Sequence, residues 1–447
     1  MKISVIGTGY VGLVSGACFA ELGHEVICVD VNKEKIDQIR KGIPPIHEIG
    51  LEDMLRDQVG KNLSASTDLT RAVQESELSI IAVGTPFDGK SIDLSFVKEV
   101  AKSLGTVLSR KSDYHTVVVK STVVPGTTDS VILPILEQAS HKRAGADFGV
   151  GMNPEFLTEG TAVQDFMNPD RIVLGGIDDR TLESLEGLYR PFVGVPRIRT
   201  NCRTAEMIKY AANAMLATQI SFINELANLS AELGDIDISD VSAGLRLSSY
   251  LSIKDSAGRM NVAPIASFLE AGCGFGGSCL PKDVNALIAH GRLHGLPMDV
   301  LSAVITTNNN QPGRLIGIIK SAVGSIKGTR IGILGLAFKP DTDDMRESPA
   351  IPIIRSLLEE GADVAAHDPV AIPEARKKFG KQVRFVEDLE ALVRSVQVIV
   401  LVTRWGVYGS IPKFVSKMKE QPLVVDGRRM FEKDEVARYV GIGFRRN

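Results

Sequence analysis

The stretch of the chain with the most reactive combination of side chains runs from Gly274 to Asp283. It reads Gly-Phe-Gly-Gly-Ser-Cys-Leu-Pro-Lys-Asp, so glycines precede Cys279 and Pro281 follows it. Proline is favoured in the first turn of a helix, where its missing N–H costs nothing. Cys279 would then lie at a helix N-terminus, where unpaired N–H groups and the positive end of the dipole favour a thiolate. Lys282 adds positive potential and Asp283 follows one turn on, although this stretch alone leaves a packed cysteine equally open.

Length and composition set the frame for that chemistry. A chain of 447 residues is too long for one hydrophobic core, so we expect two or three domains. A net charge of −3 gives no argument for nucleic acid or an acidic membrane surface, and no apolar run approaches the roughly 20 residues that span a bilayer. The five cysteines are odd in number and lack a Cys-x-x-Cys spacing, which argues against disulfides and zinc. With no leader pattern at the N-terminus, we expect a cytoplasmic protein without a metal.

The N-terminus carries a complete dinucleotide-binding pattern. A strand over residues 2–6 leads into a glycine loop and a helix over residues 11–22, and a second strand ends at Asp30. The residues of the loop are Gly7, Thr8, Gly9, Tyr10, Val11 and Gly12. The glycines permit a tight turn, close approach of a pyrophosphate and close packing of the helix. Asp30 is placed to bind both ribose hydroxyls, and its charge would repel a 2′-phosphate, so we predict NAD rather than NADP.

Further strand patterns over residues 78–83, 116–119 and 148–152 alternate with helical ones and predict a doubly wound parallel sheet. Ligands bind at the carboxyl ends of such strands. Three segments fall there: Gly84-Thr85-Pro86, Lys120-Ser121-Thr122 and Asn153-Pro154-Glu155. Ordinary turn chemistry also uses these residue types, but their shared position favours a functional role. Glu155 and Glu159 are four residues apart. The simpler interpretation of these two carboxylates is that they lie in a solvent-exposed first turn of a helix and not in a functional site.

A helical pattern from Thr204 to Leu233 predicts a helix about 45 Å long, which suits a spine between domains or a dimer interface. Lys209 and Asn213 lie one turn apart on it and face the same way. They are surrounded by apolar residues, so a lysine that extends to solvent is the alternative to a lysine in a site. The polar segment over residues 306–313, with three asparagines and a proline, is interpreted as the approach to a second linker.

A strand over residues 330–334 starts a second Rossmann-like domain. Its loop keeps Gly335 but has Ala337 and Pro340 where the first loop has glycines, so it lacks the dinucleotide fingerprint. Three basic residues fit phosphate recognition there, with surface solvation as the alternative: Lys339, Arg346 and Arg428. The predicted fold class is α/β, with two Rossmann-like doubly wound domains joined by a long central helix and a helical middle domain.

Together these motifs resemble the UDP-glucose/GDP-mannose 6-dehydrogenase family almost from end to end. The matching segments include residues 7–12, 84–86, 120–122, 153–157, 159–160, 274–279, 282–283, 335–340, 346–348 and 426–428, with Lys209 and Asn213. The family converts the C6 alcohol of a nucleotide sugar to a carboxylate and uses two NAD per turnover. The resemblance implies an NAD domain over residues 1–200, a helical dimerising domain with the cysteine loop over 201–310, and a nucleotide-sugar domain over 311–447. It also implies a homodimer or higher oligomer through the central helix.

The resemblance assigns chemical roles to several residues. Cys279 would attack the C6 aldehyde to give a thiohemiacetal and then a thioester. Lys209 and Asn213 would stabilise the oxygen at C6, Asp283 and Thr122 would hold water, and Glu155 would be the base for hydrolysis. The implied NAD contacts are Gly7, Gly9, Tyr10, Val11, Gly12, Asp30, Lys35, Thr85, Thr122, Glu159, Lys282 and Arg346. The implied substrate contacts are Glu155, Leu157, Glu159, Lys209, Asn213, Phe268, Leu269, Phe275, Gly276, Cys279, Lys339 and Arg428. The loop glycines would let sugar and nicotinamide approach Cys279, and Cys273 would have a packing role.

The sugar is less clearly implied than the reaction. UDP-glucose enzymes carry an arginine where this chain has Ala263-Pro264-Ile265, and Arg259 is only the nearest substitute. The sequence of residues 279–283 is similar to that of GDP-mannose enzymes, whereas the sequence of residues 168–171 is similar to that of UDP-glucose enzymes. We expect UDP-glucose, with GDP-mannose or a UDP-N-acetylhexosamine as alternatives. A simple NAD-dependent hydroxyacid dehydrogenase, which needs no cysteine and makes one NADH, is the second alternative.

Overall fold

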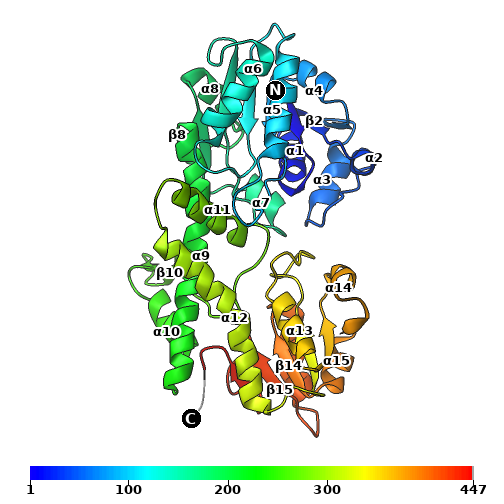
Figure 1. Ribbon diagram of the computed structural model, residues 1–447, viewed down its shortest axis with the longest axis vertical. Helices are drawn as coiled ribbons and strands as arrows, with labels where there is room; N and C mark the ends of the chain where they lie inside the picture. The colour runs from blue at the N-terminus through cyan, green and yellow to red at the C-terminus, as the bar shows by residue number, and fades with distance from the viewer. Residues whose placement is uncertain (445–447) are drawn as a thin grey trace. The chain divides into compact units, whose positions relative to one another are not determined.

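The structure is a computed structural model that describes residues 1–444, and it divides into two compact units (Figure 1). The first unit covers Met1–Ala212 and the second begins at Asn213. The division falls within α9 (Cys202–Leu233), which confirms the long helix predicted from Thr204. Among the described residues, no helix combines the length and the apolar character needed to cross a membrane.

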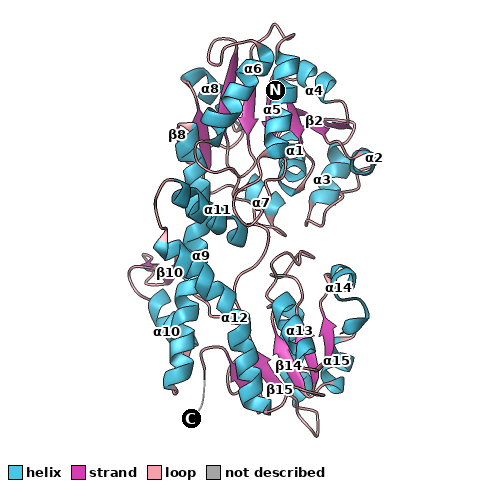
Figure 2. Cartoon of the chain, in the orientation of Figure 1, coloured by secondary structure: helices cyan, strands magenta, loops and turns pink. Residues whose placement is uncertain are grey.

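The first unit is built on an eight-stranded sheet in the order β3-β2-β1-β4-β5-β6-β7-β8. Figure 2 draws its strands in magenta among the helices. All neighbouring strands are parallel except β6 and β7. The strands are β1 (Lys2–Ile6), β2 (Glu25–Val29), β3 (Leu63–Ser66), β4 (Leu78–Ile81), β5 (His115–Val119), β6 (Phe148–Met152), β7 (Ile172–Gly176) and β8 (Arg197–Thr200). The helices are α1 (Tyr10–Glu21), α2 (Lys33–Arg40), α3 (Leu51–Gln58), α4 (Leu69–Glu75), α5 (Ser95–Leu108), α6 (Leu133–Ser140), α7 (Ala162–Met167) and α8 (Asp179–Leu188), with a π-helical turn η1 (Thr128–Ile132).

Apart from Lys2 and His115, the central strands β1, β4 and β5 consist of apolar or small residues, and these are buried because helices cover both faces of the sheet. One hydrophobic core contains Leu13 and Val14 of α1 together with Leu55 of α3. A second core contains Leu104 of α5 and Leu136 of α6. The predicted doubly wound sheet is therefore confirmed, and its carboxyl edge is the one that carries the predicted ligand contacts.

The second unit contains a six-stranded parallel sheet in the order β13-β12-β11-β14-β15-β16. Its strands are β11 (Arg330–Leu334), β12 (Asp363–His367), β13 (Arg384–Phe385), β14 (Val398–Leu401), β15 (Leu423–Asp426) and β16 (Tyr439–Gly441). A separate antiparallel ribbon pairs β9 (Ser252–Lys254) with β10 (Met260–Val262). Besides α9, the α-helices are α10 (Ile238–Arg246), α11 (Leu280–Leu293), α12 (Asp299–Val323), α13 (Ala350–Glu359), α14 (Ile372–Phe379), α15 (Leu389–Ser395) and α16 (Ile411–Val415), and 3₁₀ turns form η2 (Pro264–Phe268), η3 (Gly380–Gln382) and η4 (Gly406–Ser410).

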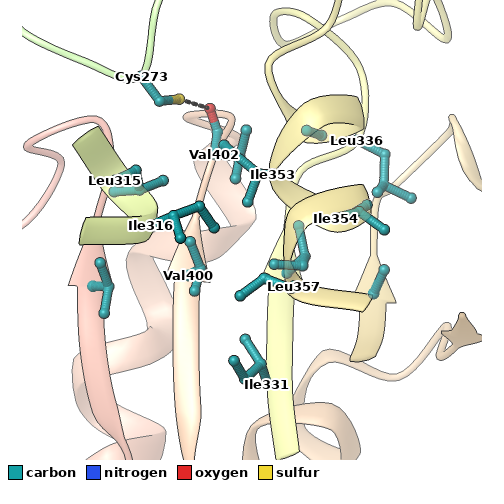
Figure 3. Packing of buried hydrophobic residues seen from close by; sticks show 14 of the residues in the cluster. Cys273, Leu315, Ile316, Ile331, Leu336, Ile353, Ile354, Leu357, Val400 and Val402 are labelled. Carbon is teal, nitrogen blue, oxygen red and sulfur yellow. Dashed lines mark hydrogen bonds between the residues drawn. The ribbon is translucent and has the colours of Figure 1, made fainter. Parts of the chain in front are cut away.

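The core of the second unit joins α12 and α13 to the sheet (Figure 3). Leu315 of α12 packs in the same cluster as Ile353 of α13 and Val400 of β14. Cys273 belongs to this cluster, and its thiol donates to the carbonyl of Val402 over 3.7 Å. Burial raises the pKa of the Cys273 thiol. The predicted packing role of Cys273 is confirmed.

The expected linker over residues 306–313 is wrong, because this segment lies inside α12 and Pro312 is within the helix. Asparagine and proline disfavour helices locally, but tertiary contacts override that preference here. The side chains of Asn308 and Gln311 hydrogen-bond to the backbone of the loop that precedes Cys279. The polar residues that suggested a linker are therefore contacts of a continuous helix.

Candidate functional site

The glycine loop of the first unit provides space for a pyrophosphate. Gly7 has a φ of +98°, and a Cβ there would lie 2.8 Å from the Ala82 carbonyl oxygen. A Cβ on Gly12 would lie 1.9 Å from the carbonyl oxygen of Gly7, so both glycines are required by the fold. A Cβ on Gly9 would meet nothing within 4 Å, and the first turn of α1 has neither a side-chain cap nor an acidic residue. The helix N-terminus is thus open to an anion, which fits the predicted NAD.

Asp30 lies at the end of β2 beside this loop. Its carboxylate accepts hydrogen bonds from the backbone N–H of Thr8 at 2.8 Å, the Thr8 hydroxyl at 2.7 Å and the Asn32 N–H at 2.9 Å. Burial alone would raise the pKa of Asp30, but these hydrogen bonds and the charge of Lys35 outweigh burial and lower it. Asp30 is therefore an anion at neutral pH, as a ribose-binding carboxylate must be.

We expect Asp30→Asn to weaken NAD binding by about 10- to 100-fold, since a hydrogen bond to a charged group contributes roughly 1.5–3 kcal/mol. The ratio of the NAD affinity to the NADP affinity should fall, because the variant lacks the charge that repels a 2′-phosphate. Titration of both cofactors by calorimetry measures the two effects. Asp37→Asn, which removes an exposed carboxylate from α2, is the matched control. Unchanged NAD affinity would show that Asp30 does not bind the ribose.

Two further predicted cofactor contacts meet at neighbouring strand ends. The Thr85 hydroxyl, after β4, donates to the backbone carbonyl of Thr122, after β5, over 2.7 Å. These two strands are hydrogen-bonded neighbours in the sheet. The structure thus brings Thr85 and Thr122 together at the carboxyl edge, as the positions of the strand ends predicted.

Lys209 and Glu155 form a buried ion pair. The Lys209 ammonium lies 2.9 Å from the Glu155 carboxylate, and only 4% and 5% of the two side chains are exposed. The second Glu155 oxygen accepts the N–H of Leu157 at 2.7 Å. Burial raises the pKa of Glu155, but the charge and hydrogen bond of Lys209 outweigh burial and lower it. The alternatives of a solvated Glu155 and a lysine that extends to solvent are therefore wrong, and Glu155 is ionised at neutral pH.

Lys120 is a buried residue of the same unit, in a strand-end segment that the sequence marked as functional without a specific role for the lysine. Its ammonium donates to the Asn153 side-chain oxygen at 2.9 Å and lies 3.4 Å from the Tyr189 hydroxyl. Burial lowers the pKa of Lys120 to about 8, against the opposing attraction of Glu155. The available signal was a lysine at the end of an otherwise apolar strand. Lys120 fixes Asn153 two residues before Glu155.

Glu48 is a second residue that sequence reasoning missed. Its buried carboxylate accepts the N–H of Gly160 at 2.7 Å and that of Ala162 at 2.8 Å, and it also accepts the Tyr10 hydroxyl. Burial and Glu48 both raise the pKa of Tyr10, which keeps the phenol protonated as a donor. Glu48 therefore ties the start of α1 to the loop that follows Glu159. No motif surrounds Glu48, and its role depends on contacts distant in sequence.

In the second unit, Cys279 is the N-cap residue of α11 and Pro281 lies in the first turn, as predicted. Cys279 is half-buried, whereas the other four cysteines are buried. The Asp283 side chain is 1% exposed. Its carboxylate accepts from the Asn213 amide at 2.6 Å and from the Lys282 ammonium at 2.5 Å. Asn213, Lys282 and Asp283 are thus brought together one turn beyond the cysteine.

The loop glycines have close protein neighbours, which gives them a packing role in addition to the ligand approach that the resemblance implies. A Cβ on Gly276 would lie 2.2 Å from the Glu347 carbonyl oxygen. One on Gly277, where φ is +84°, would lie 2.7 Å from the Phe338 ring. Packing against the chain after β11 therefore requires these glycines.

Lys339 and Arg428 line one cavity of about 180 Å³ at the carboxyl edge of the second sheet. Thr403 and Arg404 line it as well, and Arg404 pairs with Glu270. The Arg428 guanidinium donates to the Val402 carbonyl at 2.6 Å. Arg404 adds a third cation that the predicted set lacked, although it follows a strand end. The basic cavity fits the phosphates of a nucleotide sugar.

The remaining predicted contacts are distributed over both units. Leu269 and Phe275 are buried, and Leu269 belongs to the core of the second unit. The Arg346 guanidinium forms a two-pronged ion pair with Asp344. Gly276 is buried, and five of the remaining residues are half-buried: Val11, Lys35, Leu157, Glu159 and Phe268.

A doubly wound domain with an open glycine loop and a carboxylate at the end of its second strand, followed by a second Rossmann-like domain with a basic cavity, fits an NAD-dependent dehydrogenase of a phosphate-bearing substrate. Comparison with known proteins makes the class specific. Three family models match consecutive parts of the chain: the NAD binding domain of the UDP-glucose/GDP-mannose dehydrogenase family over residues 1–193, its central domain over 203–310 and its UDP binding domain over 332–433. The chain belongs to the UDP-glucose/GDP-mannose dehydrogenase family.

Individual relatives match at least nine-tenths of the chain. UDP-glucose 6-dehydrogenase TuaD of Bacillus subtilis is 42% identical, with 97% of this chain and 90% of the relative covered. GDP-mannose 6-dehydrogenase of Pseudomonas aeruginosa is 38% identical over 90% of this chain and 91% of its own. The structure of a UDP-glucose dehydrogenase from Pyrobaculum islandicum superposes with a TM-score of 0.89 at 38% identity, covering 99% of this chain and 98% of the other. The protein is thus an NAD-dependent nucleotide-sugar 6-dehydrogenase. This class agrees with the first function predicted from the sequence and not with the alternative of a simple hydroxyacid dehydrogenase.

Proposed function

We propose that the protein oxidises the C6 alcohol of UDP-glucose to UDP-glucuronate through a thioester on Cys279. The observation that carries the mechanism is the placement of Cys279 at the N-cap of α11, with the buried Asp283–Asn213 hydrogen bond one turn away. UDP-glucose is supported by the relatives named as UDP-glucose 6-dehydrogenases, and the GDP-mannose relative defines the alternative sugar. We propose the three functional regions over residues 1–200, 201–310 and 311–447.

NAD accepts one hydride in each of the two oxidations. After the alcohol has become an aldehyde, the Cys279 thiolate forms a C–S bond to C6, and the aldehyde oxygen takes a proton to give a thiohemiacetal. Loss of the second hydride and of the hydroxyl proton gives the thioester. Water then cleaves the C–S bond and releases the carboxylate and the Cys279 thiol. In sum, one alcohol, two NAD⁺ and one water give one carboxylate, two NADH and three protons.

We propose a role in this reaction for each of five residues. We assign Lys209 and Asn213 to the C6 oxygen and Asp283 with Thr122 to water. We assign Glu155 as the base for thioester hydrolysis, which its ionised state supports. Because all five cysteines are free, we propose that the protein works in the reducing cytoplasm.

Counting NADH per sugar consumed tests the reaction. We expect two NADH per molecule of UDP-glucose, and one would overturn the four-electron mechanism. The same assay with GDP-mannose, UDP-galactose and UDP-N-acetylglucosamine tests the sugar. A higher kcat/KM for any of these would replace UDP-glucose in the proposal and leave the reaction class intact.

We further propose a homodimer through the part of α9 in the second unit. Three apolar side chains recur there every seven residues and are about half exposed: Met215, Phe222 and Leu229. That spacing places them on one face of the helix, and an unpartnered apolar face is typical of an interface.

Phe222→Arg is expected to convert the oligomer to monomers, because it places a charge in the centre of this apolar face. Light scattering coupled to gel filtration measures the mass of the particle. Phe222→Leu, which keeps an apolar side chain, is the control and should remain oligomeric. A wild-type mass for Phe222→Arg would place the interface elsewhere.

A further inference from the structure

One side chain of α12 holds the backbone of the cysteine loop. The Asn308 oxygen accepts the N–H of Phe275 at 2.7 Å, and the Asn308 amide nitrogen donates to the carbonyl of the same residue at 3.1 Å. A single carboxamide thus satisfies both backbone groups of one residue, as a neighbouring β-strand would. Phe275 lies four residues before Cys279.

One turn along α12, a second loop residue has both backbone groups bound, here by two side chains. The Gln311 amide donates to the carbonyl of Gly272 at 2.9 Å, and the Asn224 side-chain oxygen accepts the Gly272 N–H at 2.8 Å. Gln311 in turn accepts from Asn228 of α9 at 2.9 Å. Gln311 and Asn224 are fully buried, so these hydrogen bonds are shielded from competing water.

Gly274 lies between the two held residues and against the same face of the helix. Its φ is +101°, and a Cβ there would lie 2.9 Å from the side-chain oxygen of Asn308 and 3.3 Å from its carbonyl oxygen. Pro312 has no N–H, so the backbone carbonyl of Asn308 receives no helical hydrogen bond from the residue four positions later. On the other side of the loop, the N–H of Gly277 donates to the Arg346 carbonyl at 2.9 Å. The path from Gly272 to Gly277 is thus fixed from both sides.

We propose that Asn308 is a positioning residue for Cys279: by fixing both backbone groups of Phe275, it sets the path of the loop and hence the place of the thiol at the N-terminus of α11. The proposal rests on the proposed function, in which Cys279 is the nucleophile. It predicts that the second oxidation is slowed much more than the first, because the second step needs the thiol and the first does not. A misplacement of about 1 Å can reduce a rate by roughly 100-fold.

The test compares the two oxidations in a single turnover of the full-length enzyme with UDP-glucose. In Asn308→Ala, the first NADH should form within about twofold of the wild-type rate, and the second should form at least about tenfold more slowly. Asn308→Asp keeps the acceptor for the Phe275 N–H but loses the donor, so its second rate should be intermediate. Asn309→Ala and Asn310→Ala change exposed asparagines of the same helix and should behave as wild type. Hydrogen exchange of the Phe275 amide should accelerate in Asn308→Ala and less in Asn308→Asp, which keeps the acceptor.

The outcomes separate positioning from a structural role. Equal slowing of both NADH steps, or an unchanged second step despite faster exchange at Phe275, would overturn the proposal. If Asn308→Ala does not fold, the same criteria apply to Asn308→Asp. A separate experiment recognises failure of the proposed function. If Cys279→Ala still produced two NADH per sugar, Cys279 would not be the nucleophile. The exchange result for Asn308 would not be affected.

Discussion

Cys279→Ala is expected to stop uronate formation, with a loss of at least about 10⁴-fold in the rate of carboxylate release, as is found when a covalent nucleophile is removed. NAD affinity should stay within about twofold, because the glycine loop and Asp30 lie in the first unit. Cys279→Ser should also fail to release the uronate, or should accumulate a slowly hydrolysed oxygen ester. Mass spectrometry of the protein and chromatography of the sugar measure these outcomes.

Cys202→Ala is the control for cysteine loss, since Cys202 is buried in the first unit and burial raises the pKa of its thiol to about 12. It should retain turnover once any change in stability has been corrected. Full production of the carboxylate by Cys279→Ala would remove the thioester from the mechanism. NAD chemistry at the alcohol would survive that result, because the first hydride transfer does not involve the thiol.

Lys209→Met should destabilise the protein by about 3–5 kcal/mol, because it leaves Glu155 as a buried charge without its partner. In the wild type the pKa of Glu155 is lowered, so the pair stabilises the fold above the ordinary glutamate pKa of about 4.3, and this contribution is lost as the pH falls through the lower folded value. In Lys209→Met, burial is no longer offset and the pKa of Glu155 should rise. That variant should therefore gain stability as the pH falls, which is opposite to the wild type. Denaturant unfolding at several pH values measures both trends.

The double variant Lys209→Met/Glu155→Gln is the decisive control. Removal of both charges leaves neither uncompensated, so most of the lost stability should return while turnover stays low. A double-mutant cycle then gives the coupling energy of the pair. Additive losses from the two single variants would show that the ion pair does not matter to the fold.

Much of this architecture could be read from the sequence where the signal is local. The glycine loop, Asp30 and the half-buried Cys279 at a helix start follow from residue type and spacing within short windows, and the structure agrees with each. Glu48 and Asn308 could not be found in this way, because their partners are more than thirty residues distant and no local pattern marks them. Residues 306–313 were misread for the same reason, since three asparagines and a proline look like a loop until their partners are known. The sequence also does not reveal that Gly276 and Gly277 pack against the Glu347 carbonyl and the Phe338 ring, because these neighbours are about seventy and sixty residues distant.

The contacts of α12 with the cysteine loop bear on how chimeras of related enzymes can be made. A transplanted loop that keeps every residue from 272 to 283 would still lose its shape if the recipient lacked the matching carboxamides at positions 308 and 311. Residues 272–283 and 304–312 are therefore best exchanged as one cassette, despite the helix that separates them in the chain. Recombination points placed between them would divide two segments that are folded together.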